Sequence, residues 1–302
     1  MNIGVIGAGK WGQALIHAIS IKHTLKVYSR QTRDIPGFCS LDEVLQCDFI
    51  IVSIATQHIA TFLKHNFKYN GQKILIASKG IDAKQNKFLF EIFEKYVPVK
   101  NLCYLSGPSF AEEVMKDLPT ALVISSHNKK LAYKFMSMFP RTVKMYYGKD
   151  VIGAEVCGAY KNVLAIAAGV SDGMALGNNA RASLVARGLV EMYRFGKKFG
   201  AKKSTFFDLS GAGDLFLTAS SPMSRNYRVG YGLANGKDLK DILEEMGEVA
   251  EGIMTSKAIH HLSKNFKIYT PIAFEVSKLL DGQTTKQTVE NLLRSKKIKN
   301  NL

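Results

Sequence analysis

The stretch "GVIGAGKWG", residues 4–12, decides how the first half of this chain folds. It places Gly7, Gly9 and Gly12 in the spacing G-x-G-x-x-G, between an apolar strand-like run and a helical pattern. In such a turn the first glycine permits the tight bend, the second lets a pyrophosphate approach the backbone, and the third allows close packing of helix on strand. Unpaired N–H groups at the helix start then face the phosphates. The stretch predicts a dinucleotide site at the first strand of a doubly wound sheet.

Strand-like and helical patterns continue to alternate up to about residue 149. The expected strands are 2–6, 25–29, 48–54, 72–78, 120–126 and 142–148, and the expected helices are 11–21, 40–47, 87–97 and 128–139. Ser40, with Glu43 three residues later, predicts a capping box at the start of one of these helices. The alternation predicts an α/β fold with a parallel, Rossmann-type doubly wound sheet and helices on both faces.

Beyond residue 149 the strand-like runs nearly vanish, and long helical patterns rich in Ala, Leu and Gly take over. We therefore expect two domains: a dinucleotide-binding Rossmann domain at 1–149 and an all-helical substrate-binding and catalytic domain at 150–302.

Arg30 stands about 20 residues past the glycine motif, at the end of the second expected strand. At this place an acidic side chain binds the ribose 2′-hydroxyl of NAD, whereas an arginine accommodates the 2′-phosphate of NADP. Between Lys26 and Arg33 there is no Asp or Glu, although Asp34 is close. The sequence favours NADP(H), or at least its acceptance.

The chain is strongly basic, with a formal charge of +16 over 302 residues, which favours anionic partners. Its lysines are scattered and are not interleaved with aromatic residues, so a nucleic-acid surface is not expected. The four cysteines have neither paired nor metal-like spacing, and no metal site is expected. The N-terminal run lacks the features of a signal peptide, and the best candidate membrane span, 151–170, is interrupted by Glu155 and Lys161. We expect a cytoplasmic protein without stable membrane insertion.

Lys161 is the most unusual residue, because it lies in the middle of the apolar helical run "VCGAYKNVLAIAAGV" at 156–170. Burial disfavours its charged form unless a partner compensates. Asp214 is a candidate partner, with Thr218 one helical turn later. A carboxylate beside it would restore the charge of the lysine and make it a positioned acid. A structural ion pair is the alternative interpretation.

Three further segments carry groups suited to an anionic ligand. "ASKG" with Lys79 and "LSGPSF" at 105–110 are turn-like and follow the apolar runs of the first half. Sheets of this type bind ligands beyond the carboxyl ends of their strands. In the second half, Arg225 is flanked by Ser224 and Asn226, a combination of donors suited to a phosphate.

These motifs occur in a recognisable order. They are "GAGKWG", "SKG", "SGPSFAEEV", "GAYKNVLAIAAGVSDGMALGNNARASLVARG", "LSGAGDL", "SRNYRVG" and "VAEG". The set resembles bacterial-type NAD(P)-dependent sn-glycerol-3-phosphate dehydrogenase, from Gly4 to about Pro271. The resemblance implies reversible reduction of dihydroxyacetone phosphate to sn-glycerol 3-phosphate, at the start of phospholipid synthesis, by an enzyme that is commonly a homodimer.

The resemblance also implies residue roles. Lys161 would be the proton donor, with Asp214 and Lys79 as its catalytic partners. The implied substrate-binding residues are Lys79, Gly107, Ser109, Asp214, Thr218, Ser224, Arg225 and Asn226. The implied cofactor-binding residues are Gly7, Gly9, Lys10, Trp11, Gly12, Arg30, Lys79, Ala111, Arg225, Val249 and Glu251.

Two positions depart from the family pattern. Thr56 stands where the family usually has a proline before Gln57, and Lys10 is bulkier than the usual small residue before the aromatic. Both lie near the expected cofactor site, so they bear on the choice of nicotinamide cofactor more than on the reaction.

Other functions remain open at this point. A related dehydrogenase of the 3-hydroxyacid or 6-phosphogluconate type shares the glycine loop and a helix-borne Lys–Asn pair, although "SGAGDL" and "SRN" disfavour it. A non-catalytic dinucleotide sensor would have no need of a lysine in an apolar helix. A basic nucleic-acid or membrane-surface protein is supported by net charge alone.

Overall fold

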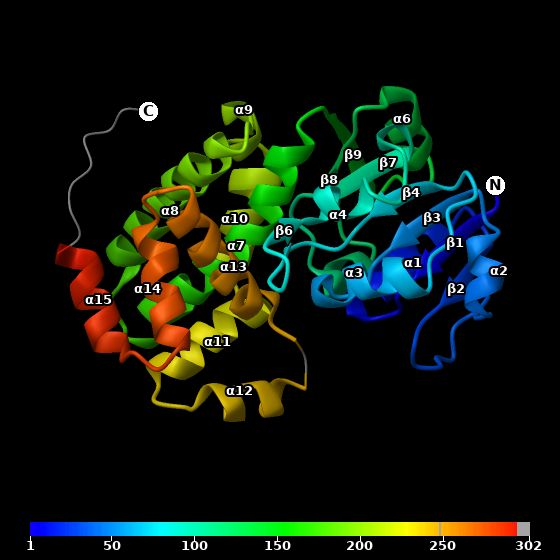
Figure 1. Ribbon diagram of the computed structural model, residues 1–302. Coiled ribbons are helices and arrows are strands. Elements are labelled where there is room, and N and C mark those ends of the chain that lie inside the picture. The colour runs from blue at the N-terminus through cyan, green and yellow to red at the C-terminus, as the bar shows by residue number, and fades with distance from the viewer. Residues whose placement is uncertain (248, 295–302) are drawn as a thin grey trace.

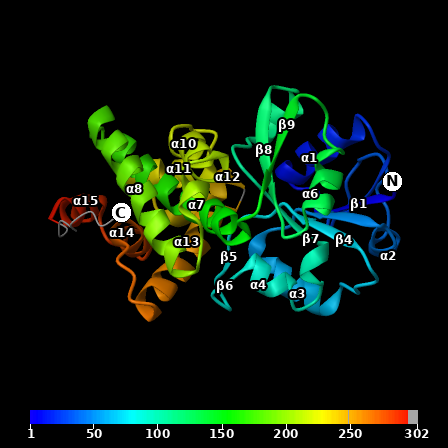
Figure 2. The ribbon, with the colours of Figure 1, turned by 90° about the horizontal axis from the view of Figure 1, so that it is seen from above.

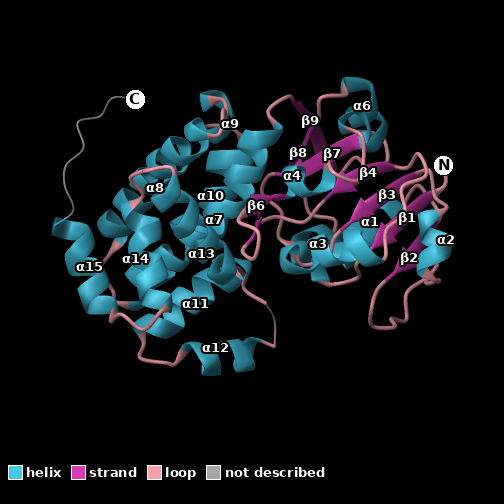
Figure 3. Cartoon of the chain, viewed as in Figure 1, coloured by secondary structure: helices cyan, strands magenta, loops and turns pink. Residues whose placement is uncertain are grey.

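The computed structural model describes residues 1–247 and 249–294. A sheet half and a helical half lie side by side, as Figure 1 and the view from above in Figure 2 show. The predicted fold class, a Rossmann-type sheet followed by a helical part, is confirmed (Figure 3). The basic end "RSKKIKNNL", to which the sequence analysis assigns no role, lies outside the described residues from 295 onward.

The sheet half is built on seven strands. In spatial order they are β2 (Leu25–Tyr28), β1 (Ile3–Ile6), β3 (Phe49–Val52), β4 (Lys73–Ile76), β7 (Leu102–Ser106), β8 (Thr120–Ser125) and β9 (Val143–Gly148). The order reverses between β1 and β3, which pair in parallel with Ile6 opposite Val52. The loops after both strands therefore leave the same edge side by side, where doubly wound sheets bind their ligands.

Helices cover both faces of this sheet because consecutive strand residues point to opposite sides. Val5 packs with α1 (Lys10–Ser20) and α6 (Lys129–Met136), whereas the next residue, Ile6, packs on the opposite face. That face carries α2 (Leu41–Leu45), α3 (Thr56–His65) and α4 (Leu89–Phe93), with the short turn η1 (Val99–Asn101) before β7. The predicted capping box of Ser40 and Glu43 is present at α2.

The prediction of an all-parallel sheet is wrong at one place. Strands β7 and β8 pair antiparallel, while β8 and β9 pair in parallel with each other. Between β7 and β8 the chain forms only the short helix α5 (Ala111–Met115), whose Val114 packs with Ala14 and Ala18 of α1. Because this connection does not cross a face of the sheet, the chain returns in the opposite direction.

The helix expected at 87–97 is shorter than predicted. Lys87 and Phe88 form β6 (Lys87–Phe88), which pairs antiparallel with β5 (Ile81–Asp82). The Asp82 carboxylate accepts the N–H groups of Lys84 and Gln85 and thereby fixes the turn. Ile81 and Phe88 are buried in the core of the helical half, so this hairpin joins the two halves.

The helical half is organised around one buried helix. Its elements are α7 (Val151–Gly173), α8 (Asn178–Lys198), α9 (Lys203–Phe206), the π-helical turn η2 (Leu209–Gly213), α10 (Asp214–Ala219), α11 (Arg225–Ala234), α12 (Leu239–Met246), α13 (Glu251–Asn265), α14 (Pro271–Leu280) and α15 (Thr285–Arg294). Helix α7 is long and apolar enough to cross a membrane, but it is the core helix here, since 94% of its most apolar window is buried inside the protein.

Helices α7 and α11 approach each other through glycines. A Cβ on Gly169 would lie 2.1 Å from the carbonyl oxygen of Tyr227, and a Cβ on Gly230 would lie 1.9 Å from that of Ile166. Both distances are far below any real contact, so each backbone occupies the space that a side chain would fill. This close contact fixes the position of α11 along α7, the helix that carries Lys161.

Two carboxylates of the helical half bond to backbone N–H groups in the first turns of helices of the sheet half. Glu155 of α7 accepts from Phe90 N in α4 at 3.0 Å, and Glu251 of α13 accepts from Thr56 N in α3 at 3.0 Å. Burial raises the pKa of Glu155 to about 8, against the opposing effect of its backbone donors. Strand β9 ends at Gly148 and α7 begins at Val151, and the division at 149/150 into two domains stays a prediction.

Candidate active site

Asp214 is the centre of a buried charge cluster between the two halves. Its Oδ1 accepts a hydrogen bond from Lys161 Nζ, and its Oδ2 accepts from Lys79 Nζ at 2.9 Å. The Asp214 side chain is fully buried, whereas those of Lys161 and Lys79 retain 10% and 15% exposure. One carboxylate therefore holds a cation from each half, and both cations keep an opening toward solvent.

Each member of the cluster is placed by its own element. Lys161 lies in the middle of α7, and Asp214 begins α10 directly after the π-helical turn η2. Lys79 follows β4 at the carboxyl edge of the sheet, and its aliphatic stem crosses α7 at Gly158, where an added Cβ would lie 3.4 Å from the Lys79 Cγ. A larger residue at 158 would crowd the stem that brings the second cation to Asp214.

The loop after β7 completes the surroundings of Lys79. Its ammonium donates to the carbonyl oxygen of Gly107 at 2.9 Å and to Ser109 Oγ at 3.2 Å. Gly107 has φ +104°, a conformation that favours glycine. Lys161 donates a further hydrogen bond to Thr218 Oγ1 at 3.2 Å. The predicted residues Lys79, Gly107, Ser109, Lys161, Asp214 and Thr218 thus form one connected network.

The charged groups in this cluster shift the pKa values of one another. Burial lowers the pKa of Lys161 to about 8, the positive charges of Lys79 and Arg225 act in the same direction, and Asp214 opposes them. Burial alone would raise the pKa of Asp214, but the two lysines outweigh it and the pKa is lowered. At neutral pH the lysine is charged, yet it gives up its proton near the pH at which an acid–base group works best.

Asn162 is a residue that the sequence analysis did not assign to the site. Its Oδ1 accepts from Asn226 Nδ2 at 3.0 Å, and Asn226 Oδ1 in turn accepts from Gly252 N at 2.9 Å. Its signal was available, because it is a second polar residue beside Lys161 in an apolar helix. Ser224 acts as the N-cap of α11, where its Oγ accepts from Tyr227 N.

The glycine loop has the geometry that a dinucleotide requires. Gly7 has φ +105°, and a Cβ on Gly12 would lie 2.0 Å from the carbonyl oxygen of Gly7. A Cβ on Gly9 would meet nothing within 4 Å, so open space lies above this part of the backbone. Trp11 Nε1 donates to the carbonyl oxygen of Ala77, two residues before Lys79, which ties the loop to the strand that presents the lysine. These residues fit a pyrophosphate at the start of α1.

Other residues that the resemblance assigns lie outside the lysine–aspartate network. Lys10, Arg30 and Arg225 are exposed, and Ala111 begins α5. Val249 is 57% exposed, while Glu251 joins the halves through Thr56. Their roles toward a cofactor or substrate stay predictions.

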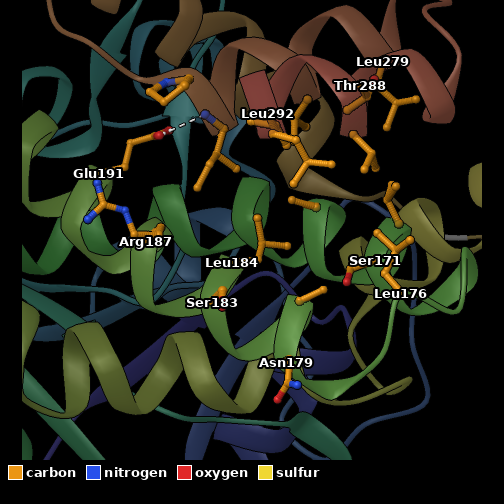
Figure 4. A pocket seen from close by; sticks show the side chains of 18 of the residues that line it. Ser171, Leu176, Asn179, Ser183, Leu184, Arg187, Glu191, Leu279, Thr288 and Leu292 are labelled. Atoms are coloured by element: carbon orange, nitrogen blue, oxygen red, sulfur yellow. Dashed lines mark hydrogen bonds between the residues drawn. The ribbon is translucent and has the colours of Figure 1, made fainter. Parts of the chain in front are cut away.

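A second buried carboxylate, Glu191 of α8, has a different environment. It accepts from Tyr160 Oη at 2.9 Å and from the N–H groups of Ile272 and Ala273 at 2.9 Å each, at the first turn of α14. Burial raises its pKa to about 7, against the effect of these donors. Glu191 borders a cavity of about 490 Å³ between α7, α8, α14 and α15, with largely apolar walls (Figure 4). The cavity lining contains none of the residues of the lysine–aspartate network.

Among residues 1–247 and 249–294, no group of three or more His, Cys, Asp or Glu side chains is arranged to hold a metal ion. The four cysteines are free, and all except Cys39 are buried.

The glycine loop, the carboxyl edge of the sheet and the buried lysine between two halves define the class: a dehydrogenase built on a dinucleotide-binding domain. Comparison with known proteins narrows it. Models of the NAD-dependent glycerol-3-phosphate dehydrogenase N-terminus and C-terminus match residues 32–132 and 150–291, respectively.

Relatives and solved structures agree with these matches. A glycerol-3-phosphate dehydrogenase [NAD(P)+] of Campylobacter lari is 56% identical over 98% of this chain and 99% of its own length. That of Sulfurimonas denitrificans is 53% identical over 97% of this chain and 99% of its own. The crystal structure of glycerol-3-phosphate dehydrogenase from Coxiella burnetii has a TM-score of 0.88 and 30% identity, covering 97% of this chain and 99% of that one. The chain belongs to the NAD-dependent glycerol-3-phosphate dehydrogenase family.

Proposed function

We propose that this chain catalyses the reversible reduction of dihydroxyacetone phosphate to sn-glycerol 3-phosphate with NADPH or NADH. The observation that supports this most is the Asp214 carboxylate, which holds Lys161 and Lys79 together where the two halves meet. A nicotinamide dinucleotide held at the glycine loop would supply a hydride to the ketone carbon, so negative charge would develop on the ketone oxygen. A cation aimed at that oxygen stabilises the transition state more than the ground state.

In this mechanism Lys161 donates its proton to the nascent alkoxide, and it accepts a proton in the reverse direction. Asp214 keeps the ammonium charged and oriented, and Thr218 accepts a second hydrogen bond from it at 3.2 Å. A pKa lowered to about 8 suits both directions, because the group is protonated at neutral pH and still transfers its proton readily.

The phosphate of the substrate matches the charge of the site. Lys79 and Lys161 both donate to one carboxylate, Asp214, and the positive charge of Arg225 acts on the pKa of Lys161. This leaves an excess of positive charge for a dianion. Arg225 and Asn226 start α11, so the positive end of that helix adds to the attraction. Phosphate binding at this place would orient the reacting carbon toward Lys161.

Several finer parts of the proposal follow from the family and the sequence. Arg30, exposed just past β2, would accept the 2′-phosphate of NADP. We further propose that the chain works in the cytoplasm as a homodimer, that its product feeds glycerophospholipid synthesis, and that its dinucleotide-binding and catalytic domains divide at 149/150.

The direct test is to mix the purified protein with dihydroxyacetone phosphate and to follow the oxidation of NADPH and NADH separately, with Lys161→Ala as the control. We expect turnover by the native chain and a loss of about 10³-fold in the variant, the size typical of losing a positioned general acid. NADH and NADPH binding by the variant should remain. Cofactor binding by the native chain without any turnover would sink the assignment.

A further inference from the structure

A hydrogen bond between two buried hydroxyl groups joins the two halves beside the lysine–aspartate network. Ser106 is the last residue of β7, and Ser210 belongs to the π-helical turn η2. Their Oγ atoms lie 2.7 Å apart, and the two residues are only 2% and 3% exposed. A buried hydroxyl group destabilises the fold unless it is paired, so each of these serines depends on the other.

The turn η2 is packed tightly on both of its sides. A Cβ on Gly211 would lie 2.3 Å from the carbonyl oxygen of Phe206, the last residue of α9, so no room is left on that side. On the other side, a Cβ on Gly213 would lie 3.7 Å from Cδ of Pro108 in the loop after β7, an ordinary van der Waals distance. Such π-helical turns often occur at functional sites. The turn is thus held by the helical half and meets the sheet half at Ser106 and Pro108.

These contacts close into a ring that includes Lys79. The Lys79 ammonium donates to the carbonyl oxygen of Gly107, the residue after Ser106, and to Asp214 Oδ2, at 2.9 Å each. Asp214 directly follows η2, the turn that carries Ser210. The Ser106–Ser210 hydrogen bond therefore closes the ring on the side opposite the ammonium. Its length bears on the distance between the two oxygens that share Lys79.

We propose that Ser106 and Ser210 are a pair of positioning residues: their hydrogen bond holds η2 against the loop after β7 and so keeps Lys79 on Asp214. Neither serine touches the reacting atoms in this arrangement, and both act through the lysine. The inference rests on the proposed function only insofar as the cluster that they position is the one that acts on the substrate.

The proposal predicts a change at a residue that neither serine contacts. Lys161 and Asp214 belong to the same half and should stay together when the hydroxyl pair is removed, whereas Lys79 should move away from them with the sheet half. The charged groups that act on Lys161 are Asp214 of α10, Lys79 of the loop after β4 and Arg225 of α11. Because the charge of Lys79 lowers the pKa of Lys161, its retreat should raise that pKa above about 8.

The experiment follows the titration of Lys161 by NMR in the full chain labelled with ¹³C at lysine Cε, with Lys161→Met to assign the signal. We expect the midpoint to move to higher pH in Ser106→Ala and in Ser210→Ala. Steady-state kinetics should show a KM for dihydroxyacetone phosphate about fivefold higher, the effect of losing one neutral hydrogen bond, with kcat within about twofold.

The double variant Ser106→Ala with Ser210→Ala separates positioning from stability. Each single variant leaves one buried hydroxyl group unpaired and should melt at a lower temperature, whereas the double variant leaves none and should regain most of that loss. The shifted titration of Lys161 should nevertheless persist in the double variant, because the link between η2 and the loop is still missing.

Ser126→Ala is the matched control. Ser126 is fully buried, and its hydroxyl donates to the carbonyl oxygen of Leu102 at 2.7 Å, at the opposite end of β7. This variant should lose stability and leave Lys161 unchanged.

An unchanged titration of Lys161 in both single variants would overturn the proposal. A shift that disappears in the double variant together with the loss of stability would also overturn it, as would an equal shift in Ser126→Ala, because either would indicate a purely structural role. The titration needs no substrate. A native chain that fails to reduce dihydroxyacetone phosphate would refute the proposed reaction, and the titration would still decide this inference.

Discussion

Two buried carboxylates accept hydrogen bonds from neighbouring residues of the same helix, and their environments differ. Tyr160 donates to Glu191 on one side of α7, while Lys161 donates to Asp214 on the other. Glu191 receives two backbone N–H groups and a phenol, so its partners are neutral, and they tie α14 to α8. Asp214 receives two ammonium groups from different halves of the chain.

The comparison shows that burial and a shifted pKa do not by themselves mark an active site. Burial raises the pKa of Glu191 to about 7, a value that would suit an acid–base catalyst. Both of its oxygens, however, already accept hydrogen bonds from backbone N–H groups. The pKa of Asp214 is lowered, because cations outweigh its burial. The carboxylate that we propose to act in the reaction is the one that holds two ammonium groups, one from α7 and one from the loop after β4.

Asp214→Asn is the change that should affect activity most. The amide keeps the shape of the carboxylate but leaves two buried ammonium groups without a counter-charge, so Lys161 loses its proton more easily and is no longer held. We expect kcat/KM for dihydroxyacetone phosphate to fall by about 10³-fold, measured by NADH oxidation. Binding of ADP, which does not reach Lys161, serves as the control. If Asp214→Asn kept activity within tenfold of the native chain, the proposal that Asp214 acts in the reaction and Glu191 does not would be contradicted.

The pH dependence of the reaction should follow Lys161 and not Glu191. The pKa of Lys161 is lowered to about 8, and reduction requires its protonated form. The rate of reduction should thus be level below pH 8 and fall about tenfold per pH unit above it, while oxidation of sn-glycerol 3-phosphate rises toward pH 8. Initial rates from pH 6 to 10 in both directions test this. A break near pH 7 that disappears in Glu191→Gln would contradict this prediction, because it would show that the rate follows Glu191 and not Lys161.

Glu191→Gln should have the smallest effect on activity and a clear effect on stability. The amide nitrogen cannot accept, so one of the three donors loses its acceptor, at a cost of about 2 kcal/mol in the free energy of unfolding at pH 5. We expect kcat within about threefold of native, since no substrate contact is lost. Chemical denaturation followed by circular dichroism gives the stability, and NADH oxidation gives kcat.

The same variant has a pH signature. Because the pKa of Glu191 in the folded protein is raised to about 7 from 4.5, its contribution to stability is complete below pH 4.5 and is lost as the pH rises through 7. The stability difference between the native chain and Glu191→Gln should therefore be larger at pH 5 than at pH 8. A difference that grows with pH would mean that Glu191 is stabilised as the anion, like Asp214.

Much of the site could be predicted from the sequence because its residues violate the local pattern. Glycines at the spacing of 7–12 and a lysine in an apolar helix both destabilise the fold unless a ligand or a partner requires them. Lys161, Asp214 and Thr218 do lie in contact, as predicted. The sequence did not show that Asp214 also holds Lys79, since the two are 135 residues apart and meet only through the packing of the halves.

Other features were missed because they depend on how the chain returns to the sheet. The run 102–106, which forms β7, has no alternation of polar and apolar residues that would predict a strand. The direction of β8 depends on α5 packing on α1, a tertiary contact that no local pattern encodes. Strand β6 lies in a stretch that predicts a helix, because Phe88 and the residues after it have helical spacing. The turn that Asp82 fixes instead brings Lys87 and Phe88 back to pair with β5.

The crossing of α7 and α11 has a consequence for how the sequence can change over time. Gly169 and Gly230 have no room for even one methyl group, and α11 begins with the residues proposed to hold the phosphate. A survey of tolerated substitutions would score these glycines as strictly as Lys161, although they take no part in proton or hydride transfer. We therefore expect substitutions in this helical half to be limited for two different reasons, one from the chemistry of Lys161 and one from the short distance between the backbones of α7 and α11.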